Sequence, residues 1–313
     1  MKQIKPKLSL IALFNSQPQA FRGAVWMLVA TFAAACQNVL VKYVTDDISV
    51  AETLFFRSIF SLTIFMPVVI RANFSHFKTN RLKLHCVRGS IHSMAQLFFF
   101  FALAVTPLAT VAALNFTGPL FTTLMAALVL GDVIRARRIT AMALGFAGAL
   151  IILRPGFIEM DIGAVSTIFS AFLWGISLVC MKFLSRTESS LTITLYGLLF
   201  SIALSGGLSI ADWVTPTLEQ FGWLVAIGAF NSVSQITRTQ AIKEADISLI
   251  MPLDFTRLIW VTLFGYILFD EFPDGWVWFG GIMIFASATY IALRERQVRI
   301  ELEKKEKAGK EKE

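Results

Sequence analysis

Charge is scarce in this chain of 313 residues. Lys, Arg, Asp and Glu make up 16% of the sequence, whereas 56% of the residues are apolar and 29 of them are Phe. A soluble domain of this size carries charge on about a quarter of its residues. The mean hydropathy of +0.68 agrees with the low charge. The composition therefore excludes an ordinary soluble domain and predicts a membrane protein whose surroundings are a lipid bilayer.

Residues that build metal and catalytic sites are also sparse. Cys36, Cys86 and Cys180 lie in or beside apolar segments at no metal-ligand spacing, so neither a zinc site nor a disulfide framework is predicted. The glycine-rich phosphate loop of ATP-binding proteins is absent, as are the HExxH and GxSxG motifs. No basic patch with interleaved aromatic residues lies outside the apolar segments. We therefore expect no cofactor, no metal, no nucleic-acid partner and no enzymatic activity.

Ten apolar segments approach the length of a membrane-spanning helix, which is about 20 residues. Turn formers and charges such as Asp46-Asp47 and Pro273-Asp274-Gly275 separate them. The fifth segment is short and is expected to begin nearer Arg135. The sequence thus predicts an all-α membrane protein with ten transmembrane helices. The predicted spans are Gly23–Val44, Val50–Ile70, His85–Thr106, Leu108–Leu130, Ile139–Leu153, Ile162–Leu184, Leu191–Ile210, Phe221–Ala241, Ser248–Phe269 and Trp276–Leu293.

Basic residues predict how these spans are oriented. Most Lys and Arg residues, with Arg238 counted among them, fall on the side of the two termini, whereas the opposite loops hold only Lys42 and Arg154. Cytoplasmic loops carry the excess of Lys and Arg. We therefore expect a multi-pass protein of the cell inner membrane with both termini in the cytoplasm. Residues 1–22 would form a cytoplasmic segment and residues 294–313 a charged cytoplasmic tail.

The two halves of the chain are similar to each other. Leu114-Asn115-Phe116-Thr117 matches Leu253-Asp254-Phe255-Thr256 at an offset of 139 residues, and Gln96 matches Gln235 and Asp132 matches Glu271 at the same offset. Each half, 23–156 and 162–293, holds five predicted spans. Because five is odd, the second half would enter the membrane from the opposite side. Such inverted repeats place a solute site near the membrane midplane, where the halves meet.

These motifs resemble those of EamA-type transporters of the drug/metabolite transporter superfamily. The resemblance rests on AETLFFRS with Arg57, on LNFTGPLFTTLMAALVLGD and on PLDFTRLIWVTLFGYILFDEFPD, and it spans residues 23–296. One departure is Asp132, where the family usually has Glu. The resemblance implies two five-helix repeats around a cavity lined mainly by the first, third, fourth, sixth, eighth and ninth helices. It also implies a small organic solute, such as S-adenosylmethionine, riboflavin or an amino-acid-like compound.

Charged residues inside a span cost about 2.5–3.5 kcal/mol on insertion scales, so each needs a partner or a water-filled cavity. Asp254 and Arg257 are three residues apart and can form an i,i+3 pair. They either line the cavity, with Asp254 as a candidate proton acceptor, or neutralise each other and fix the ninth helix. Arg57 is either an electrostatic contact for the solute or a partner for a helix end or a carboxylate.

Uncharged polar and aromatic residues complete the predicted site. Asn115 is the repeat partner of Asp254, and Trp174 could stack on a planar ring. Each of these residues has an alternative role in hydrogen bonding or packing between helices. The predicted substrate-binding residues are Asn115, Asp254, Arg257, Gln96, Gln235, Asn231, Trp174, Asn38 and Arg57.

The sequence therefore predicts a secondary transporter that moves a small organic metabolite by alternating access. Protons are a candidate coupling ion, and the protein is expected to be a monomer or a homodimer. A channel or a non-transporting membrane sensor is the first alternative. An intramembrane enzyme is the second, but it would need a cluster of His, Asp or Cys residues at one depth, and the sequence lacks one.

Overall fold

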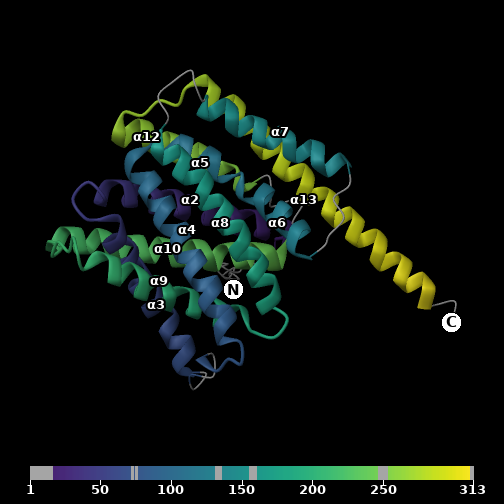
Figure 1. Ribbon diagram of the computed structural model, residues 1–313, viewed down its shortest axis with the longest axis horizontal. Coiled ribbons are helices and arrows are strands. Elements are labelled where there is room, and N and C mark those ends of the chain that lie inside the picture. Colours follow the sequence, from purple (N-terminus) through teal and green to yellow (C-terminus); the bar gives the residue numbers. More distant parts are fainter. Residues whose placement is uncertain are drawn as a thin grey trace, which may run out of the picture.

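The computed structural model describes residues 17–71, 74, 77–130, 136–154, 161–245 and 253–310. These residues contain α-helices and no strand (Figure 1). The predicted residue Asp132 and most of the segment 1–22 lie outside them. The helices are α2 (Gln19–Val44), α3 (Val50–Arg71), α4 (Leu82–Val105), α5 (Leu108–Asn115), α6 (Gly118–Leu130), α7 (Ala136–Leu153), α8 (Ile162–Leu184), α9 (Ser190–Ser209), α10 (Leu218–Glu244), α12 (Thr256–Phe269) and α13 (Gly275–Lys310).

Six helical segments are long and apolar enough to cross a membrane. They are α2, α3, α4, α8, α9 and the combined stretch Leu108–Val129 of α5 and α6. Shorter apolar stretches lie in α7, α12 and α13. The prediction of an all-helical membrane protein is confirmed, and the count of ten spans stays a prediction.

Polar residues in the connecting loops set where several helices begin. The Asp161 carboxylate accepts hydrogen bonds from the backbone of Gly163 and Ala164, at the start of α8. Ser189 caps α9 in the same manner. Thr217 and Gln220 form a reciprocal capping box at the start of α10. These side chains satisfy backbone N–H groups that the first turn of a helix leaves without partners.

The fourth predicted span is interrupted near its middle. Helix α5 ends at Asn115 and α6 begins at Gly118, followed by Pro119, which has no backbone N–H to donate. Helix α12 likewise begins only at Thr256, one residue after Phe255, which is the repeat counterpart of Phe116. The two helix ends that carry Asn115 and Asp254 thus occupy equivalent places in the two halves of the sequence.

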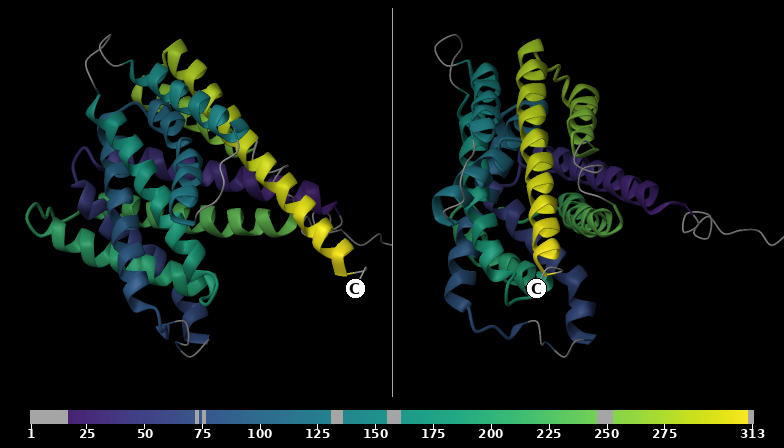
Figure 2. Two further views of the ribbon diagram at one scale, coloured as in Figure 1. Left: turned by 45° about the vertical axis from the view of Figure 1, so that its right-hand side comes forward. Right: turned by 90° about the vertical axis from the view of Figure 1, so that its right-hand side faces the viewer.

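The two halves pack against each other through matched helix pairs (Figures 1 and 2). Helix α2 packs on α10 and α4 packs on α8, and each pair joins the first helix of one half to the third helix of the other half. The hydroxyl of Ser170 donates to the carbonyl of Ala95 (2.7 Å), and that of Ser234 donates to the carbonyl of Ala30 (2.9 Å). These residue pairs occupy equivalent positions by the repeat offset, with donor and acceptor exchanged, so a hydrogen bond joins the halves at both places.

Two glycines at equivalent positions allow the halves to approach closely. A Cβ atom on Gly23 would lie 2.2 Å from the Cβ of Ala245, and one on Gly163 would lie 2.0 Å from Oγ1 of Thr106. Neither position has room for a side chain. Small residues at helix contacts are the usual means of close packing inside a membrane.

The C-terminal helix is longer than predicted. The sequence predicts a span that ends at Leu293 and a charged tail from Arg294 that is helical near the membrane and frays beyond it, whereas α13 continues unbroken to Lys310. Figures 1 and 2 show it running beside α7 and then projecting beyond the bundle. The projecting part is rich in Glu, Lys and Arg, which favour helix and form i,i+4 pairs in water.

Candidate solute-binding cavity

A cavity of about 450 Å³ lies where helices of both halves meet. It is lined by α2, α4, α5, α6, α8, α10 and the start of α12, as the resemblance implies, and in addition by Arg57 of α3 and two residues of α13. The structure brings all nine predicted residues to this cavity, namely Asn38, Arg57, Gln96, Asn115, Trp174, Asn231, Gln235, Asp254 and Arg257. Residues more than 200 positions apart in the sequence therefore share one site.

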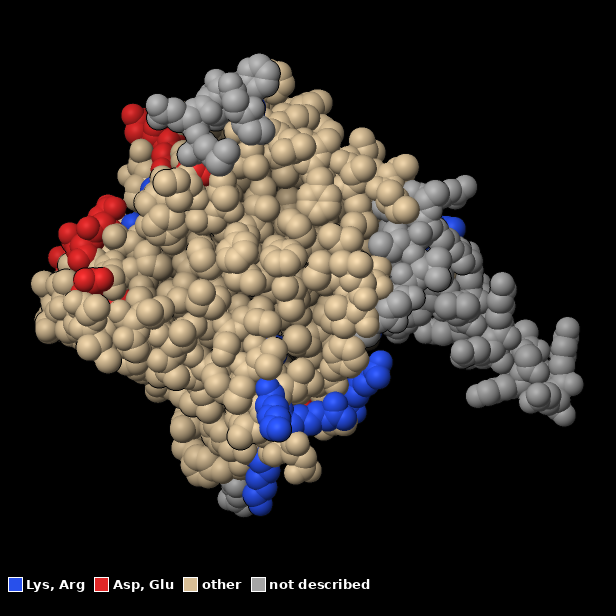
Figure 3. All heavy atoms as spheres, in the orientation of Figure 1, with Lys and Arg blue, Asp and Glu red and all other residues tan. Residues whose placement is uncertain are grey.

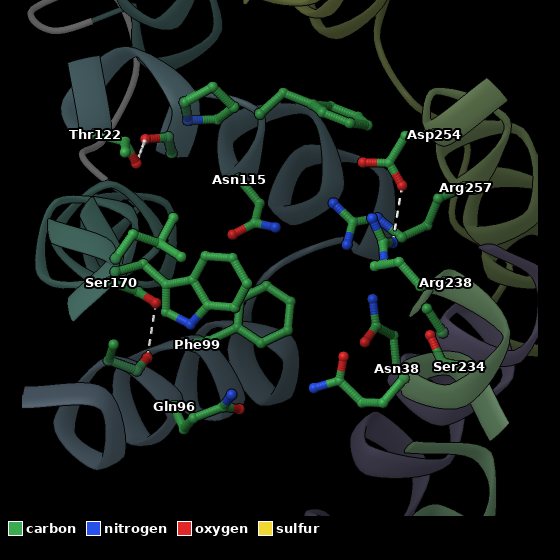
Figure 4. Close-up of a pocket in the computed structure, with 18 of the residues that line it drawn as sticks. Asn38, Gln96, Phe99, Asn115, Thr122, Ser170, Ser234, Arg238, Asp254 and Arg257 are labelled. Atoms are coloured by element: carbon green, nitrogen blue, oxygen red, sulfur yellow. Dashed lines mark hydrogen bonds and ion pairs between the residues drawn. The ribbon is translucent and has the colours of Figure 1, made fainter. Parts of the chain in front are cut away.

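The charged wall of the cavity differs from the sequence prediction. Asp254 forms its ion pair with Arg238 of α10, at 2.8 Å between Oδ1 and Nη2, and the predicted i,i+3 pair with Arg257 is not formed (Figure 4). The Arg257 guanidinium instead lies over the ring of Phe116, 5.2 Å from its centroid. Asp254, the one carboxylate in the described cavity lining, is thus paired with a residue of a different helix and not with Arg257 of its own segment.

Arg238 is the functional candidate that the sequence prediction missed. It was counted with the basic residues of the cytoplasmic loops, but it lines the cavity. The signal that could have found it is its position inside the predicted span Phe221–Ala241, because a charge there needs a partner or a cavity, as Asp254 does. Moving Arg238 out of the cytoplasmic set leaves the asymmetry of the loops large.

Arg57 reaches the cavity from the first half of α3. It is buried, with 3% of its surface exposed, and it donates a hydrogen bond to Oε1 of Gln96 (3.1 Å). Its guanidinium also lies 5.4 Å from the centroid of the Phe100 ring. It forms no salt bridge with a carboxylate in the described part of the chain, so that predicted alternative is not met.

The uncharged residues divide between packing and cavity lining. Asn231 donates to the hydroxyl of Ser61 (2.9 Å), which is the interhelical role foreseen as its alternative. Asn115 stands at the end of α5 between the charged wall and the wall formed by Phe99 and Ser170 (Figure 4). Trp174 has 41% of its surface exposed, so its indole is open for stacking. Asn38 is nearly buried, whereas Gln235 is exposed.

The comparison with known protein families decides what this architecture is. The sequence pattern of the EamA-like transporter family matches the chain twice, over residues 21–154 and 161–293. The chain belongs to the EamA-like transporter family. As a member of it, this protein is a multi-pass membrane transporter of small metabolites and is not an enzyme.

Curated relatives of this EamA-like transporter carry several solute names. The chain is 29% identical to a riboflavin transporter of Rhizobium johnstonii, over 88% of this chain and 93% of the relative. It is 24% identical to an S-adenosylmethionine uptake transporter of Rickettsia bellii, over 88% and 94%. It is also 26% identical to a pseudopaline exporter of Pseudomonas aeruginosa, over 84% and 93%. The relatives thus differ in solute and in direction.

Two ion pairs join the ends of helices in this EamA-like transporter, on either side of the cavity. At the first, which we name the Arg22 end, Arg22 of α2 pairs with Glu244 of α10 at 2.9 Å. At the second, the Lys42 end, Lys42 of α2 pairs with Glu271 at 2.5 Å, and Glu271 also accepts a hydrogen bond from the backbone N–H of Leu108 (2.9 Å). The cavity residues of α2 lie between Arg22 and Lys42, so the two pairs flank the cavity along this helix.

Proposed function

We propose that this protein is a secondary carrier that moves a small organic metabolite across the membrane by alternating access. The observation that carries the proposal is a cavity lined by polar side chains from both halves, next to the interrupted helices at Asn115 and Asp254. Interrupted helices expose backbone groups and helix ends to a solute near the middle of the membrane. Riboflavin, S-adenosylmethionine and amino-acid-like compounds are the candidate solutes that the relatives and the resemblance supply.

The alternation would come from the two halves acting as inverted five-helix repeats, 23–156 and 162–293. The contacts between Ser170 and Ala95 and between Ser234 and Ala30 support this, because they join equivalent positions of the two halves with donor and acceptor exchanged. Two similar halves can exchange conformations about a central site. In this scheme the Arg22 end and the Lys42 end open in turn.

A carrier should take up solute faster when the compartment on the other side of the membrane already contains the same solute. We expect labelled riboflavin, or whichever candidate solute binds, to enter proteoliposomes faster when the same unlabelled compound is inside. Replacement of Asn115 by Ala removes the cavity amide that would hydrogen-bond the solute and should slow this exchange about 3- to 10-fold. Replacement of Asn80, which lies in a loop away from the cavity, should leave the exchange rate unchanged.

This accelerated exchange also distinguishes a carrier from its two alternatives, a channel and a non-transporting sensor. A channel would pass solute at a rate that does not depend on the pool inside, and a sensor would bind solute without flux. Either result with a bound solute would overturn the carrier proposal.

We further propose that the protein lies in the cell inner membrane with both termini in the cytoplasm. Figure 3 shows acidic side chains gathered at one edge of the visible face and basic side chains at another, with an uncharged band between them. The exposed residues agree, since Asp47 in a loop and Glu219 at the start of α10 lie on one side of the predicted topology, and Arg81 and Arg186 lie in loops on the other. Basic residues favour the cytoplasmic side.

Reporter fusions test this topology. Green fluorescent protein fused after residue 313 should fluoresce, and alkaline phosphatase fused there should be inactive, whereas a phosphatase fusion within the loop at Asp47 should be active. A tag at residue 1 should be cleaved by protease in inside-out vesicles only. Placement of residues 1 and 313 on different sides of the membrane would contradict the arrangement of ten spans.

A further inference from the structure

The charges that line the cavity do not balance. Arg57, Arg238 and Arg257 contribute three guanidinium groups, and Asp254 contributes the one carboxylate in the described lining. Among the described residues, the lining contains no Lys, His or Glu. The cavity wall therefore carries a net charge of about +2, because arginine stays protonated in proteins. Positive charge inside a membrane protein needs compensation by anions or water.

The carboxylate compensates one guanidinium only. Asp254 is engaged by Arg238 at 2.8 Å. The other two guanidiniums form no ion pair among the described residues: Arg57 contacts Gln96 and Phe100, and Arg257 lies over Phe116 near the Asp254–Arg238 pair. The Nε atoms of Arg57 and Arg257 are buried and have no hydrogen-bond partner among the described residues. Arg57 is 97% buried, so its charged guanidinium is shielded from bulk water while at least one of its N–H groups remains able to donate a hydrogen bond.

The opposite side of the cavity is less polar and partly aromatic. Figure 4 shows Asp254, Arg257 and Arg238 together on one side, and Phe99, Gln96 and Ser170 on the other. The hydroxyl of Ser170 already donates its hydrogen bond to the carbonyl of Ala95. Trp174 lines the cavity with an indole that is partly exposed. A solute that spans the cavity would therefore meet donors at one end and ring faces at the other.

We propose that the solute is an organic anion with a planar ring, and that Arg257 binds its negative group. Arg57 adds to the positive potential and supplies a second donor. This inference rests on the proposed carrier function and names the class of its solute. Guanidinium groups bind carboxylates and phosphates in a geometry that matches both oxygens. A net cation such as S-adenosylmethionine fits this cavity less well than an anionic compound of similar size.

Matched pairs of compounds that differ only in an anionic group test the proposal. The purified full chain in detergent would be titrated with flavin mononucleotide against riboflavin, nicotinate against nicotinamide, and adenosine monophosphate against adenosine. Thermal shift and calorimetry would give the melting temperature and the Kd. We expect the anionic member of at least one pair to bind more tightly than its neutral partner. Equal or tighter binding of the neutral members, or no binding of any anion, would overturn the inference.

Variants connect the effect to the named residues. Arg257→Gln should weaken binding of the anion about 10- to 100-fold, which corresponds to the loss of one hydrogen-bonded charge, and should leave the neutral partner unaffected. Arg257→Lys should retain part of the affinity. If the Arg257→Gln variant does not fold, the Arg57→Gln variant is tested in its place, and it should likewise weaken binding of the anion but not of the neutral partner. Arg186→Gln, at an exposed position away from the cavity, is the matched control.

The same preparation separates this inference from the carrier proposal. Reconstituted protein that binds the anion but shows no accelerated exchange would contradict the carrier function and leave the anion site in place. Exchange of neutral or cationic compounds only would support a carrier and reject the anionic solute.

Discussion

Replacement of Asp254 by Asn is expected to destabilise the protein by about 2–3 kcal/mol. The change leaves the Arg238 guanidinium in the cavity wall without its carboxylate, and breaking a fully buried ion pair costs about 3–5 kcal/mol. The value expected here is lower because the side chains of Arg238 and Asp254 keep 30% and 20% of their surfaces exposed. Thermal unfolding of the purified variant measures the loss.

A double-mutant cycle identifies the partner of Asp254. Arg238→Gln should cost a similar amount, and the combination with Asp254→Asn should cost clearly less than the sum of the two changes, because each single change removes the same pair. The cycle between Asp254 and Arg257 should give a smaller coupling energy, since those two residues form no ion pair in the structure. A larger coupling to Arg257 would contradict the arrangement of the charged wall.

The Asp254→Asn variant also tests whether transport is coupled to protons. If Asp254 were the acceptor of the coupling proton, Asp254→Asn would retain exchange and lose accumulation driven by a proton gradient. The ion pair with Arg238 gives the carboxylate a structural role instead, so we expect exchange and accumulation to fall together. Retained exchange with lost accumulation would show that Asp254 takes part in coupling despite its partner.

The sequence was sufficient to predict nine of the residues that line the cavity, although it missed Arg238, and this has a physical reason. A polar or charged side chain inside an apolar span has a large cost in lipid, so it must face the protein interior or a cavity. Asn115, Gln96 and Asp254 satisfy that condition, and the internal repeat added that Asn115 and Asp254 are equivalent. All nine predicted residues line the same cavity. Their role in binding a solute stays a prediction.

The partners of those residues could not be predicted in the same way. Periodicity along one helix shows which residues share a face, and it favoured the pair of Asp254 with Arg257. The actual partner, Arg238, lies on α10, so the ion pair depends on how α10 packs beside residue 254. The extension of α13 to Lys310 was missed for a different reason, because a run of charges was interpreted as a solvated tail although Glu and Lys also favour helix.

Removal of the ion pair at the Lys42 end is expected to open the cavity toward that side. Glu271 holds Lys42 at 2.5 Å and the backbone N–H of Leu108 at 2.9 Å, and Lys42 in turn donates to the carbonyl of Thr106 (3.0 Å). Glu271→Gln removes the charge on which this group of contacts depends. A change of about 1.4 kcal/mol in the balance between closed and open forms corresponds to a tenfold change in their ratio.

Thiol labelling measures the opening. Ala34 lines the cavity on α2 and is replaced by Cys in a variant whose three native cysteines are changed to Ser. We expect Glu271→Gln to increase the rate at which an impermeant maleimide outside intact cells modifies this Cys, by about tenfold. Charge reversal of both partners, Lys42→Glu with Glu271→Lys, should return the rate toward that of the parent.

The pair at the Arg22 end supplies the matched control. Glu244→Gln weakens the contact with Arg22 on the opposite side of the cavity, so it favours the form that is closed to the outside. The labelling rate at residue 34 from outside should then stay the same or fall. Because α2 carries Arg22 at one end and Lys42 at the other, opposite responses to these two similar charge removals would distinguish alternating access from a general loosening of the bundle. Equal increases in both variants would contradict alternating access.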